Sequence, residues 1–194
     1  MKNNIFHALT VIGTVLLSGC TIHVNGADGK DGEDGKTTNL LTHTTYECSK
    51  EKSDLNLTVD YHKINVTGDC QTVTITGKYN QISISNLKKL DVKGVSNKIQ
   101  ITDAEMAIMS GVSNILTAKK IVALQVAGVS QVIKADSIYD IDSSGVSNVV
   151  ETIAAQNINV SGISSEVYYE KSTDAKKVSV NTSGLNSSAK QRKS

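Results

Sequence analysis

The chain has 194 residues, which suits one domain, and 39% of them are hydrophobic, which is enough to form a core. There is no Trp, no Pro and a single Phe, so aliphatic side chains must fill that core. Lys and Arg number 20 against 19 Asp and Glu. This near-neutral balance argues against a nucleic-acid partner, which would require a basic surface.

Residues 1–19 have the pattern of a secretion signal. The apolar run Phe6–Leu17 is too short for a bilayer span, which needs roughly 20 residues. The segment ends in Leu17-Ser18-Gly19-Cys20, which resembles the bacterial lipobox, where small residues precede a Cys that receives lipid. The resemblance implies a membrane anchor of two or three acyl chains on Cys20. Because Thr21, not Asp, follows the Cys, it also implies sorting to the outer membrane, on either face. An ordinary signal peptide that happens to end in Cys is the alternative.

With Cys20 used for lipid, Cys48 and Cys70 remain as one pair in an oxidising compartment. We expect a disulfide between them that closes a loop of about 22 residues. A thiol pair for metal or redox chemistry is the alternative, although only His62 lies nearby and the C-x-x-C spacing is absent.

Residues 20–45 show no hydrophobic periodicity, and Gly recurs every third position from Gly26 to Gly35. Such triplets resemble collagen, but four of them without Pro cannot hold a triple helix. The Asp residues between them lack the spacing of an EF-hand calcium loop. We therefore predict a flexible tether.

The remainder of the chain is dominated by a repeat of 17 residues. Gly94-Val95-Ser96-Asn97 recurs at Gly111, Gly128, Gly145 and Gly162, and Gly77-Lys78-Tyr79-Asn80 is a degenerate first copy. Six copies at one fixed step are the signature of a solenoid.

Apolar residues recur within each unit at positions six, eight, fourteen and sixteen, counting the Gly as position one. Position six, for example, holds Ile82, Ile99, Leu116, Ile133, Val150 and Val167. Spacings of two with many β-branched residues indicate strands, not helices. The pattern predicts two short strands per unit, near positions five to nine and thirteen to three. The fold class is therefore all-β, a single parallel β-solenoid (β-helix) of 17-residue coils.

Two repeated residue types are the candidate structural ladder of this solenoid. Gly at position one would serve a bend with positive φ or a close approach of neighbouring coils. The amides at position four would stack along the axis, amide bonding to amide, and a sugar-binding stripe of Asn and Ser is the alternative. The ladder residues are Gly94, Asn97, Gly111, Asn114, Gly128, Gln131, Gly145, Asn148 and Gly162.

The solenoid is expected to span residues 46–181. Leu55–Thr76 would form an N-terminal cap held by the disulfide, and Val178–Val180 would add a last strand. Counting in steps of 17 places Ala175 at position fourteen of the last unit. Residues 182–194, rich in Ser and Lys, are predicted to form a disordered basic tail. An uncapped C-terminal coil could also support edge-to-edge assembly.

The motif Gly68-Asp69-Cys70 followed by Val-x-Ile-x-Gly, together with the Gly-x-x-Asn units, resembles a bacterial exported family catalogued as domain of unknown function 3060. The resemblance covers roughly Cys48–Val167. It implies an exported β-solenoid and transfers no catalytic residue.

No catalytic or metal site emerges from the sequence, and no cofactor is expected. Asp136, Asp140, Asp142 and Glu151 form the best acidic cluster, and paired carboxylates could hydrolyse a glycoside, but solvated strand faces carry the same residues. No nucleotide-binding Gly motif is present. We expect a non-enzymatic envelope lipoprotein whose solenoid is a structural or binding module. Its partners would be the membrane, through the lipid, and a surface glycan, peptidoglycan or an envelope protein. A carbohydrate-active β-helix lyase or hydrolase is the alternative.

Overall fold

The structure, a computed structural model, describes residues 42–48, 54–174 and 176–193. The predicted signal peptide, Cys20 and the tether up to residue 41 lie outside the described residues. The described part folds into twelve strands and no helix, so it contains no helix that could cross a membrane. The strands are β1 (Thr42–Cys48), β2 (Asp54–Leu57), β3 (His62–Ile75), β4 (Gln81–Val92), β5 (Lys98–Met109), β6 (Ile115–Val126), β7 (Val132–Ser143), β8 (Val149–Val160), β9 (Glu166–Tyr169), β10 (Lys171–Ser172), β11 (Ser179–Thr182) and β12 (Ser188–Gln191).

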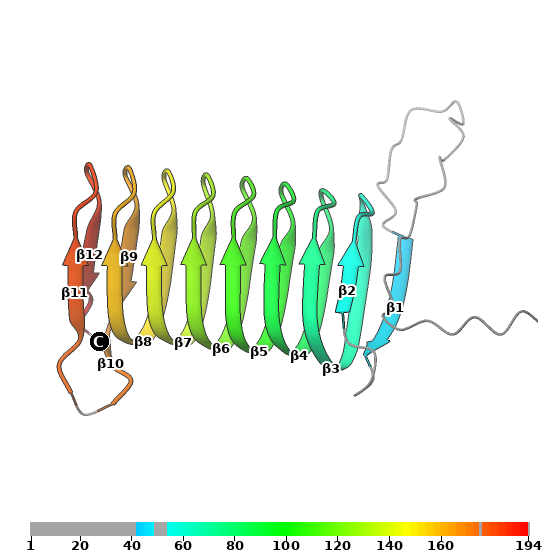
Figure 1. Cartoon of the computed structure of the whole chain (residues 1–194), viewed down its shortest axis with the longest axis horizontal. Coiled ribbons are helices and arrows are strands. Elements are labelled where there is room, and N and C mark those ends of the chain that lie inside the picture. Colours follow the sequence, from blue (N-terminus) through cyan, green and yellow to red (C-terminus); the bar gives the residue numbers. More distant parts are fainter. Residues whose placement is uncertain (1–41, 49–53, 175, 194) are drawn as a thin grey trace, which may run out of the picture.

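The strands form a parallel β-solenoid of about seven coils, as predicted (Figure 1). Each strand from β3 to β8 pairs in parallel with the next one along the chain. From β4 to β8 the paired residues are 17 apart, so Ile82 pairs with Ile99, Ile99 with Leu116 and Leu116 with Ile133. Identical positions therefore stack into columns along the solenoid axis.

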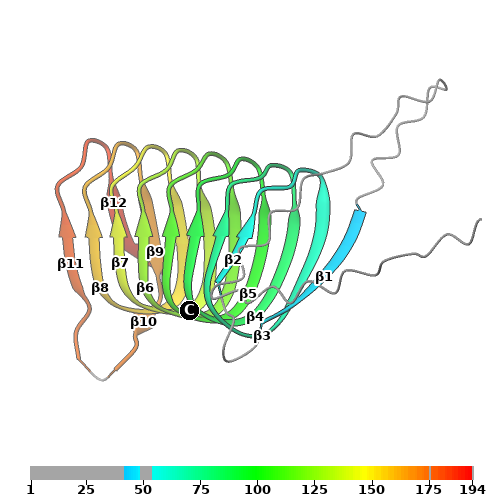
Figure 2. The same cartoon turned by 45° about the vertical axis from the view of Figure 1, so that its right-hand side comes forward.

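Each coil contains one long bent strand where we predicted two short ones. β4–β8 have 12 residues each, and the backbone curls around one edge of the solenoid (Figure 2). Pairing between β4 and β5 skips Ser85 and Lys88, so each strand consists of three short straight segments joined by two bends. The middle segment buries a column at position eleven that the sequence analysis missed: Leu87, Ala104, Ile121, Ile138 and Ala155. This column lies three positions from each neighbouring buried column, so a search for spacings of two does not find it.

The core is a narrow aliphatic column with no space for large rings. Ile, Leu, Val, Ala and Met fill it, and Leu90, Ala107 and Leu124, stacked at position fourteen, are at most 1% exposed. Each coil buries its inward side chains only against its neighbours, so stability accumulates along the axis.

The turns between coils carry their positive φ at the third position and not at the Gly. Ser113 has φ 55°, whereas Gly68 is the one described Gly with a positive φ. Of the two roles predicted for the repeated Gly, positive φ and close backbone approach, only the second applies. The non-Gly residues in the left-handed region are Tyr61, Tyr79, Ser96, Ser113, Ser130, Ser147, Ser164 and Asn186.

The C-terminal end differs from the prediction. An insertion after β10 lengthens the coil, so Val180 pairs with Ile158, 22 residues earlier, and takes position fourteen in place of Ala175. The loop that contains the insertion projects beyond the other coils (Figure 1). The prediction of a disordered tail is wrong for residues 182–193, because Gly184 repeats the turn and β12 pairs in parallel with β9. A search at a fixed 17-residue step could not find this copy.

At the N-terminal end, β1 begins at Thr42, inside the segment predicted as tether, and pairs with the first half of β3. β2 pairs with the second half of β3, so β1 and β2 together make the first coil. The other predicted domain boundaries remain predictions.

Candidate functional site

The amide ladder lies inside the solenoid. Asn80, Asn97, Asn114, Gln131 and Asn148 are at most 1% exposed. The side-chain oxygen of each accepts a hydrogen bond from the backbone N–H at the same position one coil earlier, for example Asn97 N to Asn114 Oδ1 at 2.9 Å. Because these amides do not reach solvent, they cannot form the sugar-binding stripe that was the alternative.

The ladder amides form more hydrogen bonds with backbone groups than with each other. Amide-to-amide bonds join Asn80 to Asn97 and Asn97 to Asn114, each at 3.0 Å. Asn114 Nδ2 instead donates to the carbonyl of Gly94 at 2.9 Å, and Asn148 Nδ2 donates to Gly128 at 3.0 Å. The ladder therefore satisfies polar groups of the turn, which would otherwise be buried without a partner.

The repeated Gly makes this arrangement possible through close approach. A Cβ on Gly111 would overlap the carbonyl oxygen of Gly94 and the Nδ2 atom of Asn114. A side chain at this position would therefore push apart both the neighbouring turn and the ladder amide.

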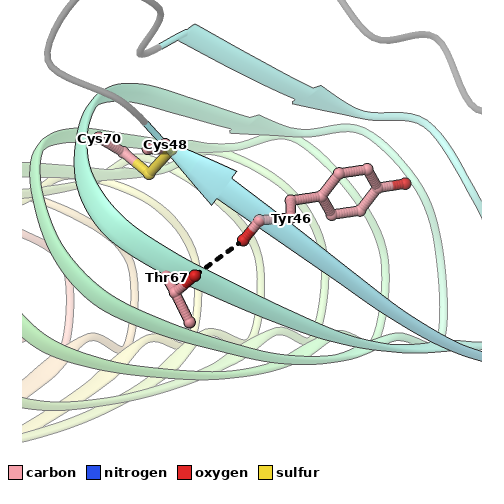
Figure 3. Close-up of a disulfide and its surroundings, with 4 residues drawn as sticks. All are labelled: Tyr46, Cys48, Thr67 and Cys70. Atoms are coloured by element: carbon pink, nitrogen blue, oxygen red, sulfur yellow. Dashed lines mark hydrogen bonds between the residues drawn. A yellow bond between two sulfur atoms is a disulfide. The ribbon is translucent and has the colours of Figure 1, made fainter.

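The disulfide joins the first two coils, with the Cα atoms of Cys48 and Cys70 5.2 Å apart (Figure 3). A bulge in β3 brings the two strands together: Gly68 has φ +80°, and a Cβ there would overlap the carbonyl of Cys48. Next to it, Thr67 Oγ1 donates to the carbonyl of Tyr46 at 3.3 Å. Burial raises the pKa of Tyr46. The role of this region is to fix the terminal coil.

The predicted acidic cluster divides between two parts of the surface, with Asp136 and Glu151 in one depression and Asp140 and Asp142 in another. Asp140 and Asp142 lie in the last segment of β7, where they accept hydrogen bonds from Asn157 (2.6 Å) and Asn159 (3.1 Å) in β8. Glu151 lies in the first segment of β8, between Lys134 and Arg192 at 3.0 Å each. Hydrogen bonds from these two cations hold the pKa of Glu151 below its ordinary value. A general acid for glycoside hydrolysis would need the opposite shift.

The C-terminal strand clasps the neighbouring coils through β12 and the residue after it. Lys190 Nζ pairs with Glu166 at 2.8 Å, and Arg192 pairs with Glu151. The Arg192 guanidinium also lies 3.9 Å from the centroid of the Tyr168 ring. These contacts pair Glu151 and Glu166 with cations on this face of the solenoid, whereas Asp136, which lines the same depression as Glu151, forms no ion pair with any described residue.

The N-terminal half of the same face is a groove whose lining contains no Asp or Glu. An open depression of about 650 Å³ crosses β1, β3, β4, β5 and β6, over the first segment of each strand. Its outward side chains come from positions five and seven. They are His43, Thr45, Lys63, Asn65, Gln81, Ser83, Lys98, Gln100, Ile115 and Thr117. We call this surface the amide groove. Positions five and seven follow the same 17-residue step as the core, so the repeat predicts that their side chains stack but not that they form a groove.

Metal and histidine chemistry find no support in the part of the chain that the structure describes. No group of three or more His, Cys, Asp or Glu could hold a metal ion there. His62 extends the turn pattern, since its backbone N–H donates to Asn80 Oδ1 at 2.8 Å and its Nδ1 lies 2.7 Å from the carbonyl of Asp60.

Comparison with known proteins gives one match. No curated protein and no solved structure matches the chain. The one match is to a family model over residues 61–110, which lie within the range Cys48–Val167 expected from the sequence resemblance and cover less than half of it. It covers about three turns of the solenoid, including the Gly68-Asp69-Cys70 motif and the first two Gly of the repeat, Gly77 and Gly94. Residues 61–110 of the chain match the family described as "Protein of unknown function (DUF3060)", which confirms the resemblance over that segment.

Proposed function

We propose that the protein is a lipid-anchored, non-enzymatic binding module of the bacterial envelope. Lipid on Cys20 attaches it to the outer membrane, the segment up to residue 41 gives it reach, and the solenoid presents a rigid, repetitive surface. The observation that carries the binding role is the amide groove, an open face whose polar side chains have no partner among the described residues. On the adjoining half of the face, by contrast, Glu151 and Glu166 are paired with cations.

The anchoring part rests on the sequence Leu17-Ser18-Gly19-Cys20. A single acyl chain binds membranes weakly, whereas two or three bind almost irreversibly, so lipidated Cys20 would keep the solenoid on the membrane.

The non-enzymatic part is supported by the distribution of the carboxylates. A glycosidase places two carboxyl groups on either side of one bond, with the pKa of one of them raised. The carboxylates of Asp140, Asp142 and Glu151 are each held by an amide or a cation of a neighbouring strand. Such cross-coil pairs stabilise the rod and engage each of these three carboxylates.

The test is metabolic labelling of the expressing bacterium with a radioactive or alkyne-tagged fatty acid. The wild-type chain should incorporate label and sediment with the outer membrane, whereas Cys20→Ala should do neither. A wild-type chain that is released in soluble, unlabelled form would overturn the anchoring. Protease added to intact and then to permeabilised cells assigns the face, since cleavage only after permeabilisation places the solenoid in the periplasm.

A further inference from the structure

The amide groove differs from the rest of its face in having unpaired polar groups. Lys63 and Lys98 form no ion pair with any described residue, and the amides of Asn65, Gln81 and Gln100 form no hydrogen bond with the described part of the chain. In β7 and β8, by contrast, the side chains at position seven, Lys134 and Glu151, pair with each other. Side chains at these outward positions can thus pair with each other across neighbouring coils, and in the described residues they do so only outside the groove.

The charge of the groove has one sign. Its lining contains Lys63, Lys98 and His43 and no Asp or Glu. The chain as a whole is nearly neutral, with a formal net charge of +1, so this face concentrates positive charge that the rest of the molecule balances elsewhere. An open, positively charged surface attracts an anionic ligand.

The groove is also periodic. Lys63 and Lys98 occupy position five of β3 and β5, and Gln81 occupies the same position of β4 between them. Adjacent strands are ~4.8 Å apart, so the two lysines repeat at about 9.6 Å along the axis. That is the length scale of a disaccharide in an extended glycan, and the five strands of the groove extend about 19 Å.

The column beside the lysines supplies hydrogen bonds suited to sugar hydroxyls. Position seven alternates hydroxyl and amide side chains: Thr45, Asn65, Ser83, Gln100 and Thr117. Hydroxyl and amide groups both donate and accept, as sugar hydroxyls require. At the end of the groove Ile115 is 36% exposed and offers an apolar contact.

From the charge, the spacing and the hydrogen-bonding column together, we propose that the amide groove binds an extended acidic polysaccharide that runs along the solenoid axis. Carboxylates of the polymer would pair with Lys63 and Lys98, and its hydroxyls would bond to the column at position seven. A membrane of anionic lipids would use the lysines and would not require the hydrogen-bonding column. This inference deepens the proposed function by naming its ligand class.

The experiment measures binding of the full chain, purified in detergent, to polygalacturonate and to alginate by isothermal titration calorimetry at low salt. The methyl-esterified polymers, which are uncharged, provide the ligand control. Lys63→Gln/Lys98→Gln should weaken binding about tenfold, as expected for the loss of two exposed ion pairs. The matched control Lys88→Gln/Lys119→Gln removes the same charge from exposed sites outside the groove and should bind like wild type. Ser83→Trp, which fills the groove without changing its charge, should also weaken binding.

Three outcomes would overturn the inference. They are failure of the wild-type chain to bind either acidic polymer, equal loss in the two lysine pairs, and equal binding of the esterified polymers. Lysine-dependent binding to phosphatidylglycerol vesicles without binding to polymer would assign the face to a membrane instead. Because calorimetry uses purified protein, failure here is distinct from failure of fatty-acid labelling, which concerns only the anchor.

Discussion

Removal of one ladder amide should destabilise the whole rod although it changes nothing on the surface. Asn114 is the most informative position, because it is 0% exposed and has a ladder amide on both sides. In Asn114→Ala, the backbone N–H of Asn97 loses its acceptor, Asn114 Oδ1. Asn97 Nδ2 loses one hydrogen bond and keeps the one to the Gly77 carbonyl. The Gly94 carbonyl also loses one and keeps the one that it accepts from the Val112 N–H.

The expected loss in the free energy of unfolding follows from these three bonds. An orphaned buried N–H costs about 1–3 kcal/mol, and each of the two other bonds contributes about 0.5–1.5 kcal/mol. We therefore expect Asn114→Ala to cost about 2–6 kcal/mol, against a total stability of roughly 5–15 kcal/mol for a domain.

Urea unfolding followed by circular dichroism measures this loss. The control is Gln125→Ala, an exposed position in β6, the strand that follows Asn114, and its truncation should cost less than about 0.5 kcal/mol. Asn114→Asp adds a pH test, because its carboxylate would face the Gly94 carbonyl. Burial raises the pKa of such a carboxyl in the folded state, so the variant should regain stability as the pH falls and the carboxyl is protonated. If Asn114→Ala and Gln125→Ala unfold at the same urea concentration, the ladder does not support the fold in the way argued here.

Three further outcomes are expected. Ser113→Val should lower the free energy of unfolding, measured by thermal unfolding, by about 1–2 kcal/mol, because a β-branched residue is strained at φ 55°. Ser113→Gly should be tolerated, and equal effects of the two variants would refute the role of positive φ. Cys48→Ser/Cys70→Ser should lower stability by roughly 3 kcal/mol, as expected for a loop closed over 22 residues, and hydrogen exchange should increase first in β1; unchanged protection of β1 would contradict this. The pKa of Glu151 is lowered in the folded state. The ion pairs of Glu151 therefore stabilise the fold fully at a pH above the ordinary pKa of a carboxyl group, and this stabilisation is lost as the pH falls through the lowered pKa. Relative to the intrinsic exchange rate at each pH, the protection of β12 amides from hydrogen exchange should therefore fall in acid, and Glu151→Gln should weaken that pH dependence. An unchanged dependence would count against the clasp.

The sequence predicts this fold well wherever one residue type is forced on every coil. The Gly-x-x-Asn units mark the turns because Gly allows the close approach and the amide satisfies the buried backbone, a role that the hydroxyls of Ser165 and Ser187 take over in the last coils. What the pattern could not predict depends on local geometry. The column of Ile121 lies between two bends and breaks the spacing of two, and the insertion before β11 shifts the register to 22. The amide groove escaped notice for another reason, since outward columns differ from coil to coil and only the structure shows which side chains remain unpaired.

The central claim, a module that binds glycan without cleaving it, is tested most directly by size-exclusion chromatography of polygalacturonate incubated with the full chain. The account predicts that the polymer co-elutes with the protein and, once released by high salt, has its original chain length after prolonged incubation. Progressive shortening of the polymer, abolished in Lys63→Gln/Lys98→Gln, would contradict it and establish an enzyme in its place.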